Sequence, residues 1–302
     1  MSRAAPSVLR VATRGTPLAR AQTGLVIDAL RRVHPQVQCE PVVVRTVGDA
    51  DTTRPLTALG ERGVFTKALQ DALLEGRADV AVHSFKDLPT EPAPGLTIAA
   101  VPRRGDPREA LVAGSVRSLA DLEPGATLGT GSPRRGAQAL RRRPDLNIVP
   151  LRGSVGTRVA AQREGRIHAT IMAVAGLRRA GLDAAISAVL EPPDFLPAPA
   201  QAALAVEART DRADVLALVA AIEDASARAA TTAERAFLHD LQGGCSLPAA
   251  ALATVNGDDL VLDTAVYVED GGVVRTYRRG PAAEAAALGR EAAAETVARG
   301  VT

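Results

Sequence analysis

The chain has very few aromatic side chains and no strong net charge. Aromatic residues make up 2% of the 302 residues, and tryptophan is absent. Proteins that hold single-stranded nucleic acid stack bases on aromatic side chains, so this scarcity argues against such a surface. The net charge of +2 also gives no whole-chain attraction to polyanions. We therefore expect no nucleic-acid partner.

Cysteine and long apolar runs are scarce as well. The two cysteines and four histidines are scattered, so they form no metal-ligand pattern, and we expect no metal. The longest uncharged stretch, residues 241–257, contains a proline and three glycines, which excludes a membrane span. Arginines also interrupt the N-terminal residues, where a secretion signal would be apolar. These absences predict a cytoplasmic protein with reduced thiols and no membrane partner.

Lysine occurs only at Lys67 and Lys86, and the other 34 basic residues are arginine. Because alanine is also abundant, arginine alone carries little information here. The two exceptions carry more, since one of them stands beside Asp87. Lysine presents a compact ammonium group rather than a planar fork, which indicates a specific need at Lys86.

Strand and helix patterns alternate through the first 241 residues, which predicts α/β architecture with parallel or mixed sheets. The expected strands are 8–13, 41–47, 78–82, 96–101, 127–130, 147–151, 168–174 and 202–208. The expected helices are 19–33, 65–76, 133–143, 154–164, 174–181, 212–223 and 227–241. A proline-rich connection, residues 191–200, precedes the last of these strands. The final sixty or so residues differ, because three strands separated by turns and an alanine-rich helix predict a small α+β domain.

Two segments combine a strand end, a Gly/Ser turn, a helix start and arginines: GTGSPRR at 129–135 and LRGSVGTR at 151–158. Ser132 followed by proline is a typical helix N-terminus. Free N–H groups there, with guanidinium forks beside them, favour small carboxylates or phosphates. The arginines expected to bind such anions are Arg134, Arg135, Arg152 and Arg158. Arg141, Arg142 and Arg143 are expected on a solvated helix face instead.

Asp87 follows the strand expected at 78–82, within HSFKDLPT. Two interpretations remain open. Asp87 and Lys86 form a surface ion pair worth about 0–1 kcal/mol, or Asp87 is a carboxylate held ionised by nearby guanidiniums. In the second case it can stabilise a positive charge that develops on a substrate.

Cys245 follows two glycines in LQGGCSLP, in a loop expected between a helix and a strand. Glycines allow a sharp bend there, which indicates an accessible thiol used for attachment or as a nucleophile. Cys39 precedes a run of β-branched residues and is expected to be a buried structural thiol. A catalytic pair of Cys245 with His83 or His239 has no supporting sequence pattern.

These stretches together resemble the porphobilinogen deaminase (hydroxymethylbilane synthase) family. The resemblance runs nearly end to end and rests on several motifs in the same order. They are VATRGTPLARAQT, GERGVFTKAL, ADVAVHSFKDLPT, DPREALV, GTGSPRR, LRGSVGTR, AVAGLRRAGL, TAERAFL and GGCS.

The resemblance implies a transferase of tetrapyrrole (haem) biosynthesis. Such an enzyme links four porphobilinogen units into hydroxymethylbilane, with loss of ammonia at each addition. The growing chain starts on a dipyrromethane cofactor joined to Cys245 by a thioether. Asp87 would be the catalytic acid/base and would stabilise the azafulvenium-like cation.

Arginines would bind the acetate and propionate groups of cofactor and substrate, according to the same resemblance. The residues implied around the cofactor are Cys245, Lys86, Ser132, Arg134, Arg135 and Arg158. The residues implied around the substrate are Arg14, Thr16, Arg152 and Arg179.

The fold implied has three domains, two of them similar to the lobes of periplasmic binding proteins. Domain 1 would comprise residues 1–102 and 199–220 and carry the catalytic aspartate, and domain 2 would comprise residues 103–198 with the anion-binding arginines. Domain 3, residues 221–302, would carry the cysteine loop. The family also implies a monomer.

The chain departs from the family's usual residues at five positions. Alanines stand at Ala200 and Ala202 instead of glycine, which puts the backbone of the return segment in question. The other departures are Arg62, Gly131 and Ser154, in place of a lysine, a serine and an asparagine. A second hypothesis stays open: a non-catalytic protein with two lobes that binds a small anion or senses an effector.

Overall fold

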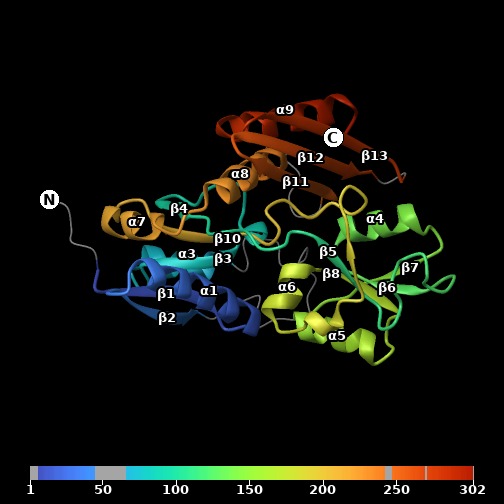
Figure 1. Cartoon of the computed structure of the whole chain (residues 1–302), viewed down its shortest axis with the longest axis horizontal. Coiled ribbons are helices and arrows are strands. Elements are labelled where there is room, and N and C mark those ends of the chain that lie inside the picture. Colours follow the sequence, from blue (N-terminus) through green and yellow to red (C-terminus); the bar gives the residue numbers. More distant parts are fainter. Residues whose placement is uncertain (1–5, 45–65, 242–246, 269–270, 302) are drawn as a thin grey trace. The chain divides into compact units, whose positions relative to one another are not determined.

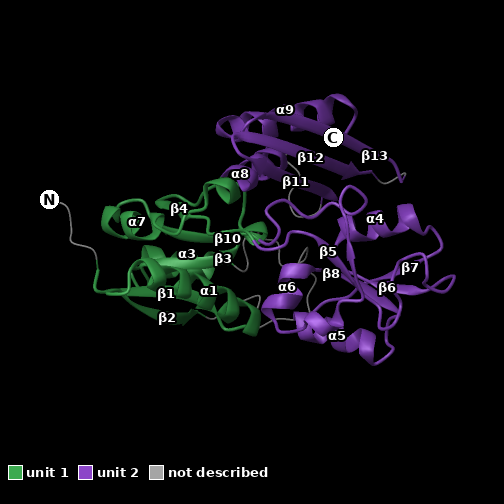
Figure 2. Ribbon diagram, in the orientation of Figure 1, with its two compact units in different colours: residues 1–104, 203–228 green, residues 105–202, 229–302 purple. Residues whose placement is uncertain are grey.

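The computed structural model describes residues 6–44, 66–241, 247–268 and 271–301. The chain divides into two compact units, shown in Figure 2. Unit 1 comprises residues 1–104 and 203–228, and unit 2 comprises residues 105–202 and 229–302. The chain therefore enters unit 2 after Arg104 and returns to unit 1 at Ala203.

Unit 1 is built on a five-stranded mixed sheet in the order β2-β1-β3-β10-β4 (Figure 1). Strand β1 runs parallel to β2 and β3, whereas β10 runs antiparallel to β3 and β4. The strands are β1 (Val8–Arg14), β2 (Gln38–Val44), β3 (Val80–Ser84), β4 (Leu96–Ala100) and β10 (Leu204–Arg209). In the described part of this unit, α1 (Pro17–Val33), α3 (Lys67–Leu74) and α7 (Ala213–Ala220) pack with the sheet, and a 3₁₀ turn η2 (Phe85–Asp87) follows β3.

Helix α1 begins two residues before the expected position. The hydroxyl of Thr16 accepts a hydrogen bond from the N–H of Ala19, 3.3 Å away, and Pro17 occupies the first helical position. Both features favour a helix N-terminus. Val26 and Leu30 of this helix pack into the same buried cluster as Leu9 of β1.

Unit 2 contains a second five-stranded sheet, in the order β7-β6-β8-β5-β9. Strand β6 runs parallel to β7 and β8, and β5 runs antiparallel to β8 and β9. The strands are β5 (Glu109–Val112), β6 (Thr127–Gly129), β7 (Asn147–Val149), β8 (Ala169–Ala173) and β9 (Ala188–Leu190). The helices are α4 (Pro133–Arg142), α5 (Val155–Arg163) and α6 (Val174–Arg179), and a 3₁₀ turn, η3 (Asp183–Ala185), precedes β9.

A separate antiparallel sheet, β11-β12-β13, lies in the same unit. It comprises β11 (Ala249–Asn256), β12 (Asp259–Tyr267) and β13 (Val273–Pro281), followed by the 3₁₀ turn η4 (Ala282–Glu284) and helix α9 (Ala285–Ala298). Helix α8 (Ala225–Asp240) contributes the buried Phe237 to this core. A Cβ on Gly289 of α9 would lie 2.3 Å from the carbonyl oxygen of Ala233, so glycine lets the two helices approach closely. The expected meander and alanine-rich helix are confirmed.

The return segment, residues 191–202, has unusual backbone geometry at Ala200 and Ala202. Ala200 has φ of 59° and Ala202 has φ of 70°, a region that favours glycine. The N–H of Ala200 donates to the carboxylate of Glu234, 2.6 Å away. The carbonyl oxygen of Ala202 accepts a hydrogen bond of 2.6 Å from Arg179. These contacts within unit 2 hold a strained conformation in place.

The architecture confirms the prediction of α/β sheets followed by a small α+β region. The three-domain division stays a prediction. The sheet β7-β6-β8-β5-β9 precedes the return segment and the sheet β11-β12-β13 follows it, and both belong to unit 2. Among the described helices, none is long and apolar enough to cross a membrane.

Candidate functional site

The expected site residues of unit 1 lie at the carboxyl ends of two neighbouring parallel strands. Arg14 ends β1 and Thr16 follows it, whereas Lys86 and Asp87 follow β3 in the turn η2. Ligands of open α/β sheets bind at this edge. Asp87 is exposed to solvent, and Arg14 and Lys86 are half-buried. The structure therefore presents the carboxylate at the edge where sequence reasoning placed it.

The end of β3 is anchored on both sides. The side chains of Ser84 and Gln22 exchange hydrogen bonds of 2.8 and 3.1 Å, which ties the strand to α1. The N–H of Phe85 donates to the carbonyl oxygen of Ala203 over 3.0 Å, which ties the turn to the start of β10. The buried ring of Phe85 then leaves Asp87 on a fixed turn.

A buried polar group supports the same strand. The Nε2 atom of His83 lies 3.0 Å from a carboxylate oxygen of Glu207, and both side chains are buried. The side-chain amide of Gln70 in α3 donates to the other oxygen of Glu207, also over 3.0 Å. His83 therefore faces β10, as a structural histidine does.

The expected anion-binding residues of unit 2 follow three adjacent strands. Strands β6, β7 and β8 are parallel, so their carboxyl ends share one edge of the sheet. Helices α4, α5 and α6 follow these strands and carry all the expected arginines except Arg152. Arg152 is exposed in the turn after β7, and Arg158 is half-buried in α5. Arg179 ends α6.

The turns at this edge use the expected cap residues. The hydroxyl of Ser132 accepts from the N–H of Arg135 at 3.4 Å, and that of Ser154 accepts from the N–H of Thr157 at 3.2 Å. Ser154, which stands where the family usually has asparagine, thus keeps a capping function. Gly153 has φ of 106°, which only glycine adopts easily. A Cβ on Gly131 would lie 3.2 Å from the carbonyl oxygen of Leu151, so that turn is tight.

Arg134 and Arg135 are buried, with exposed fractions of 5% and 7%, and both bind Glu109. Arg135 contacts the carboxylate through Nε at 3.1 Å and Nη2 at 2.8 Å. Arg134 contacts it through Nη2 at 2.6 Å and donates from Nη1 to the carbonyl oxygen of Leu196 at 2.7 Å. Burial lowers the pKa of Arg134, and the charge of Glu109 opposes that effect. The two arginines therefore form a fixed pair around one internal carboxylate.

Sequence reasoning missed Glu109. The residue lies in the DPREALV motif, but its strand β5 is four residues long and was not predicted. An acid inside a short, otherwise apolar strand is the one sequence feature that points to a buried ionic contact.

Arg179 is engaged with the protein backbone. Its Nη2 donates to the carbonyl oxygen of Ala202, and burial lowers the pKa of its guanidinium. The Nη2 atom of Arg179 therefore holds the return segment at the point where the chain leaves unit 2.

The three arginines expected on a helix surface lie near the end of α4. Arg141 and Arg142 are exposed, and Arg142 pairs with Asp194. Arg143 binds Asp145 through Nε and Nη2, each at 2.8 Å. The prediction of a solvated helix face is wrong for Arg143, which is half-buried at the C-cap of α4 and donates from Nη1 to the carbonyl oxygens of Leu119, Ala120 and Leu122.

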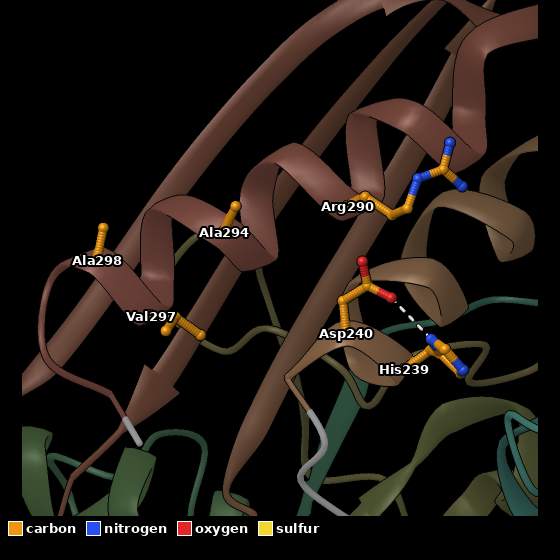
Figure 3. A pocket seen from close by; sticks show the side chains of 6 residues that line it. All are labelled: His239, Asp240, Arg290, Ala294, Val297 and Ala298. Carbon is orange, nitrogen blue, oxygen red and sulfur yellow. Dashed lines mark hydrogen bonds and ion pairs between the residues drawn. The ribbon is translucent and has the colours of Figure 1, made fainter.

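Two expected residues, Cys245 and Arg62, lie outside the described residues. Helix α8, which precedes Cys245 in the chain, borders an open depression of about 540 Å³ shared with α9 (Figure 3). It is lined by His239, Asp240, Arg290, Ala294, Val297 and Ala298. His239 Nδ1 lies 2.7 Å from Asp240, and none of the residues expected to bind an anion lines this depression.

The geometry of unit 2 fits an anionic ligand with several carboxylates. Five arginines follow three strands at one edge, and two helices of eight residues or more begin there with capped N-termini. Within the cluster of Glu109, Arg134 and Arg135, two positive charges face one negative charge. Small molecules with carboxylates are the kind of ligand that such residues hold.

Comparisons with known proteins agree over nearly the whole chain. A family model described as "Porphobilinogen deaminase, dipyromethane cofactor binding domain" matches residues 9–217, and one described as "Porphobilinogen deaminase, C-terminal domain" matches residues 229–298. A porphobilinogen deaminase of Roseiflexus sp. is 46% identical over 97% of this chain and 96% of its own length. One from Bordetella parapertussis is 45% identical over 98% of this chain and 95% of its own.

Solved structures give a weaker match. The methionine-binding protein MetQ covers 72% of this chain and 90% of its own, with 12% identity and a TM-score of 0.46. Similarity at that level carries no functional information.

Proposed function

The chain belongs to the porphobilinogen deaminase family, and from that premise we propose that it has hydroxymethylbilane synthase activity. In this reaction four porphobilinogen units are joined head to tail and each addition releases ammonia. The observation that supports the proposal most directly is the edge of unit 2 where three parallel strands end and arginines follow each of them in the chain. The family assignment also favours an enzyme over a non-catalytic binding protein.

The arginines act by binding carboxylates. Arg134, Arg135 and Arg158, with Ser132 and Lys86, would hold the cofactor, and Arg14, Thr16, Arg152 and Arg179 would hold the substrate. Guanidinium forks match carboxylates in two-point contacts, which orient a planar ring more strictly than a single charge does. Correct orientation of the reacting carbons is itself a large part of the rate enhancement.

Asp87 is the residue that we assign to the chemistry. When the C–N bond of the protonated aminomethyl group breaks, its electron pair leaves with nitrogen as ammonia and a cation develops on the remaining carbon. The α-carbon of the acceptor pyrrole then supplies the electron pair of the new C–C bond and loses its proton. An ionised Asp87 stabilises the cation and can accept that proton. Its place on the anchored turn η2 fixes the carboxylate for this task.

The cofactor supplies a pyrrole with a free α-carbon, on which elongation begins. We assign its attachment to the thiol of Cys245, which follows α8 in the chain. The proposed organisation is three domains, with Asp87 in residues 1–102 and 199–220, the arginine edge in residues 103–198, and the cysteine loop in residues 221–302.

We also propose that the enzyme works as a cytoplasmic monomer with porphobilinogen as its small-molecule partner. The family resemblance supports this, and no nucleic-acid or membrane partner is needed for the reaction. Size-exclusion chromatography with light scattering tests the assembly state, since a dimer would double the mass of 31.2 kDa per chain.

Incubation of the purified protein with porphobilinogen tests the activity. We expect one ammonia per porphobilinogen consumed and a linear tetrapyrrole as product. Porphobilinogen that binds without release of ammonia would contradict the proposal and support the binding protein instead.

A further inference from the structure

Glu109 is a fully buried acid and the first residue of β5 in unit 2. It belongs to β5, where it pairs with Ala173 of β8 and Leu190 of β9. Its exposed fraction is 0%, and its carboxylate lies within 2.6 to 3.1 Å of nitrogen atoms of Arg134 and Arg135. Sequence separations of 25 and 26 residues make this a contact created by folding.

The charges that the described residues bring to this cluster do not balance. Its ion pairs join two guanidiniums to one carboxylate, which leaves one formal positive charge among side chains that are almost fully buried. Buried charges are costly unless they are paired, because the protein interior replaces water poorly. Arg134 and Arg135 also sit in the first turn of α4, where the helix dipole is positive. The cluster therefore favours one further negative charge.

The contacts also fix where that charge can bind. The carboxylate of Glu109 accepts hydrogen bonds from Nε and Nη2 of Arg135. On Arg134, Nη1 donates to the carbonyl oxygen of Leu196 and Nη2 donates to Glu109. Within the described part of the chain, Nη1 of Arg135 makes no hydrogen bond. Contacts within the protein thus orient both guanidinium groups, and Nη1 of Arg135 can donate to a ligand.

We propose that Glu109 is a positioning residue that acts as an internal counter-ion: it orients Arg134 and Arg135 and neutralises half of their charge, and a carboxylate of the bound cofactor neutralises the rest. This inference rests on the proposed function, because it takes the cofactor as the anion. It predicts that the stabilities conferred by Glu109 and by the cofactor are coupled. A protein without the Glu109 charge depends more strongly on the cofactor.

The test compares melting temperatures of cofactor-free and cofactor-bound protein for wild type and Glu109→Gln. Cofactor-free protein is made in cells that cannot supply porphobilinogen, and the bound form is made by incubation with porphobilinogen. We expect Glu109→Gln to lower the melting temperature of the cofactor-free form more than that of the bound form. The gap, which is the difference in melting temperature between the two forms, should widen by about 3 °C or more, a shift of the size that a single destabilising substitution produces in a domain of about 150–250 residues.

Asp79→Asn is the matched control. Asp79 is also a buried carboxylate shared by two arginines, Arg10 at 3.0 Å and Arg212 at 3.1 Å, but it lies at the opposite end of β3 from Asp87. We expect this substitution to lower both melting temperatures equally. Glu109→Asp keeps the charge, so its gap should stay close to that of wild type.

An unchanged or narrower gap in Glu109→Gln overturns the proposal, as does a gap in Glu109→Asp as wide as in Glu109→Gln. A Glu109→Gln chain that folds in neither form also overturns it, because Glu109 would then be purely structural. If the two forms of wild type melt at the same temperature, the proposed cofactor binding is wrong instead. That outcome is distinct from one that overturns only the proposal for Glu109.

Discussion

The carboxylate of Glu234 in α8 accepts a hydrogen bond of 2.6 Å from the backbone N–H of Ala200, a residue held at φ of 59°. The same carboxylate accepts from the N–H of Ala253 in β11 over 2.7 Å. One buried acid therefore joins the strained return segment to the C-terminal sheet. The contact therefore bears on how the free energy of unfolding changes when Ala200 becomes glycine and when the Glu234 carboxylate is removed.

Glycine at Ala200 should relieve backbone strain. A non-glycine residue in the left-handed region costs roughly 1–2 kcal/mol. Ala200→Gly also removes a buried methyl group and adds chain entropy to the unfolded state. Ala205→Gly has the same two effects without a positive φ, and both alanines have an exposed fraction of 0%. We expect the free energy of unfolding of Ala200→Gly, measured by urea unfolding, to exceed that of Ala205→Gly by about 1–2 kcal/mol. Equal stability of the two variants would show that Ala200 is not strained.

Removal of the Glu234 side chain should destabilise unit 2. Glu234→Ala leaves two buried N–H groups without their acceptor, and hydrogen bonds to charged groups contribute about 1.5–3 kcal/mol each. We expect a loss of about 3 kcal/mol or more in the free energy of unfolding, and a smaller loss for Glu234→Gln, which keeps one acceptor oxygen. A loss below about 1 kcal/mol in Glu234→Ala would contradict this assignment.

Acid should weaken unit 2 partly through Asp106. Hydrogen bonds from Arg108 at 2.7 and 2.9 Å hold the pKa of this carboxyl below its ordinary value of 3.8. A lowered pKa in the folded state stabilises the fold above the ordinary pKa, and that stabilisation is lost as the pH falls below it. We expect the free energy of unfolding to fall less steeply between pH 5 and pH 2 in Asp106→Asn than in wild type. The measurement is urea unfolding across that range, and identical slopes would rule out a contribution from Asp106.

Asp87 should be required for turnover and dispensable for the cofactor. General acid–base catalysis typically contributes a factor of about 10² to 10⁴. We expect Asp87→Asn to lose at least about 100-fold in ammonia release while its intact mass still includes the cofactor. The control is Asp28→Asn, an exposed aspartate of α1, which should keep normal turnover. Near-normal turnover of Asp87→Asn would remove Asp87 from the mechanism.

Local sequence patterns predicted most of the architecture. Strong patterns such as Ser132-Pro133 at a helix start and the β-branched run of β2 predicted the right element types. The short strands β5 and β9 were missed, because four and three residues do not show a period. Their pairing comes from neighbours that are distant in sequence.

The candidate site was predictable where the information is local. The capping function of Ser132 follows from the Ser-Pro pair. The contact of Glu109 with Arg134 and Arg135 does not follow from sequence, because it depends on how β5 and α4 pack. The motif comparison drew attention to Ala200, but its positive φ is a property of the folded backbone.

The most direct test of the account is the intact mass of the protein. Wild-type chain produced with a supply of porphobilinogen should exceed its sequence mass by that of one covalently bound dipyrromethane. Cys245→Ser should show the sequence mass alone, melt at a lower temperature because a ligand bound only by the native state stabilises it, and release no ammonia. An unmodified wild-type chain that still converts porphobilinogen, or a Cys245→Ser chain that carries the same added mass, would contradict the account.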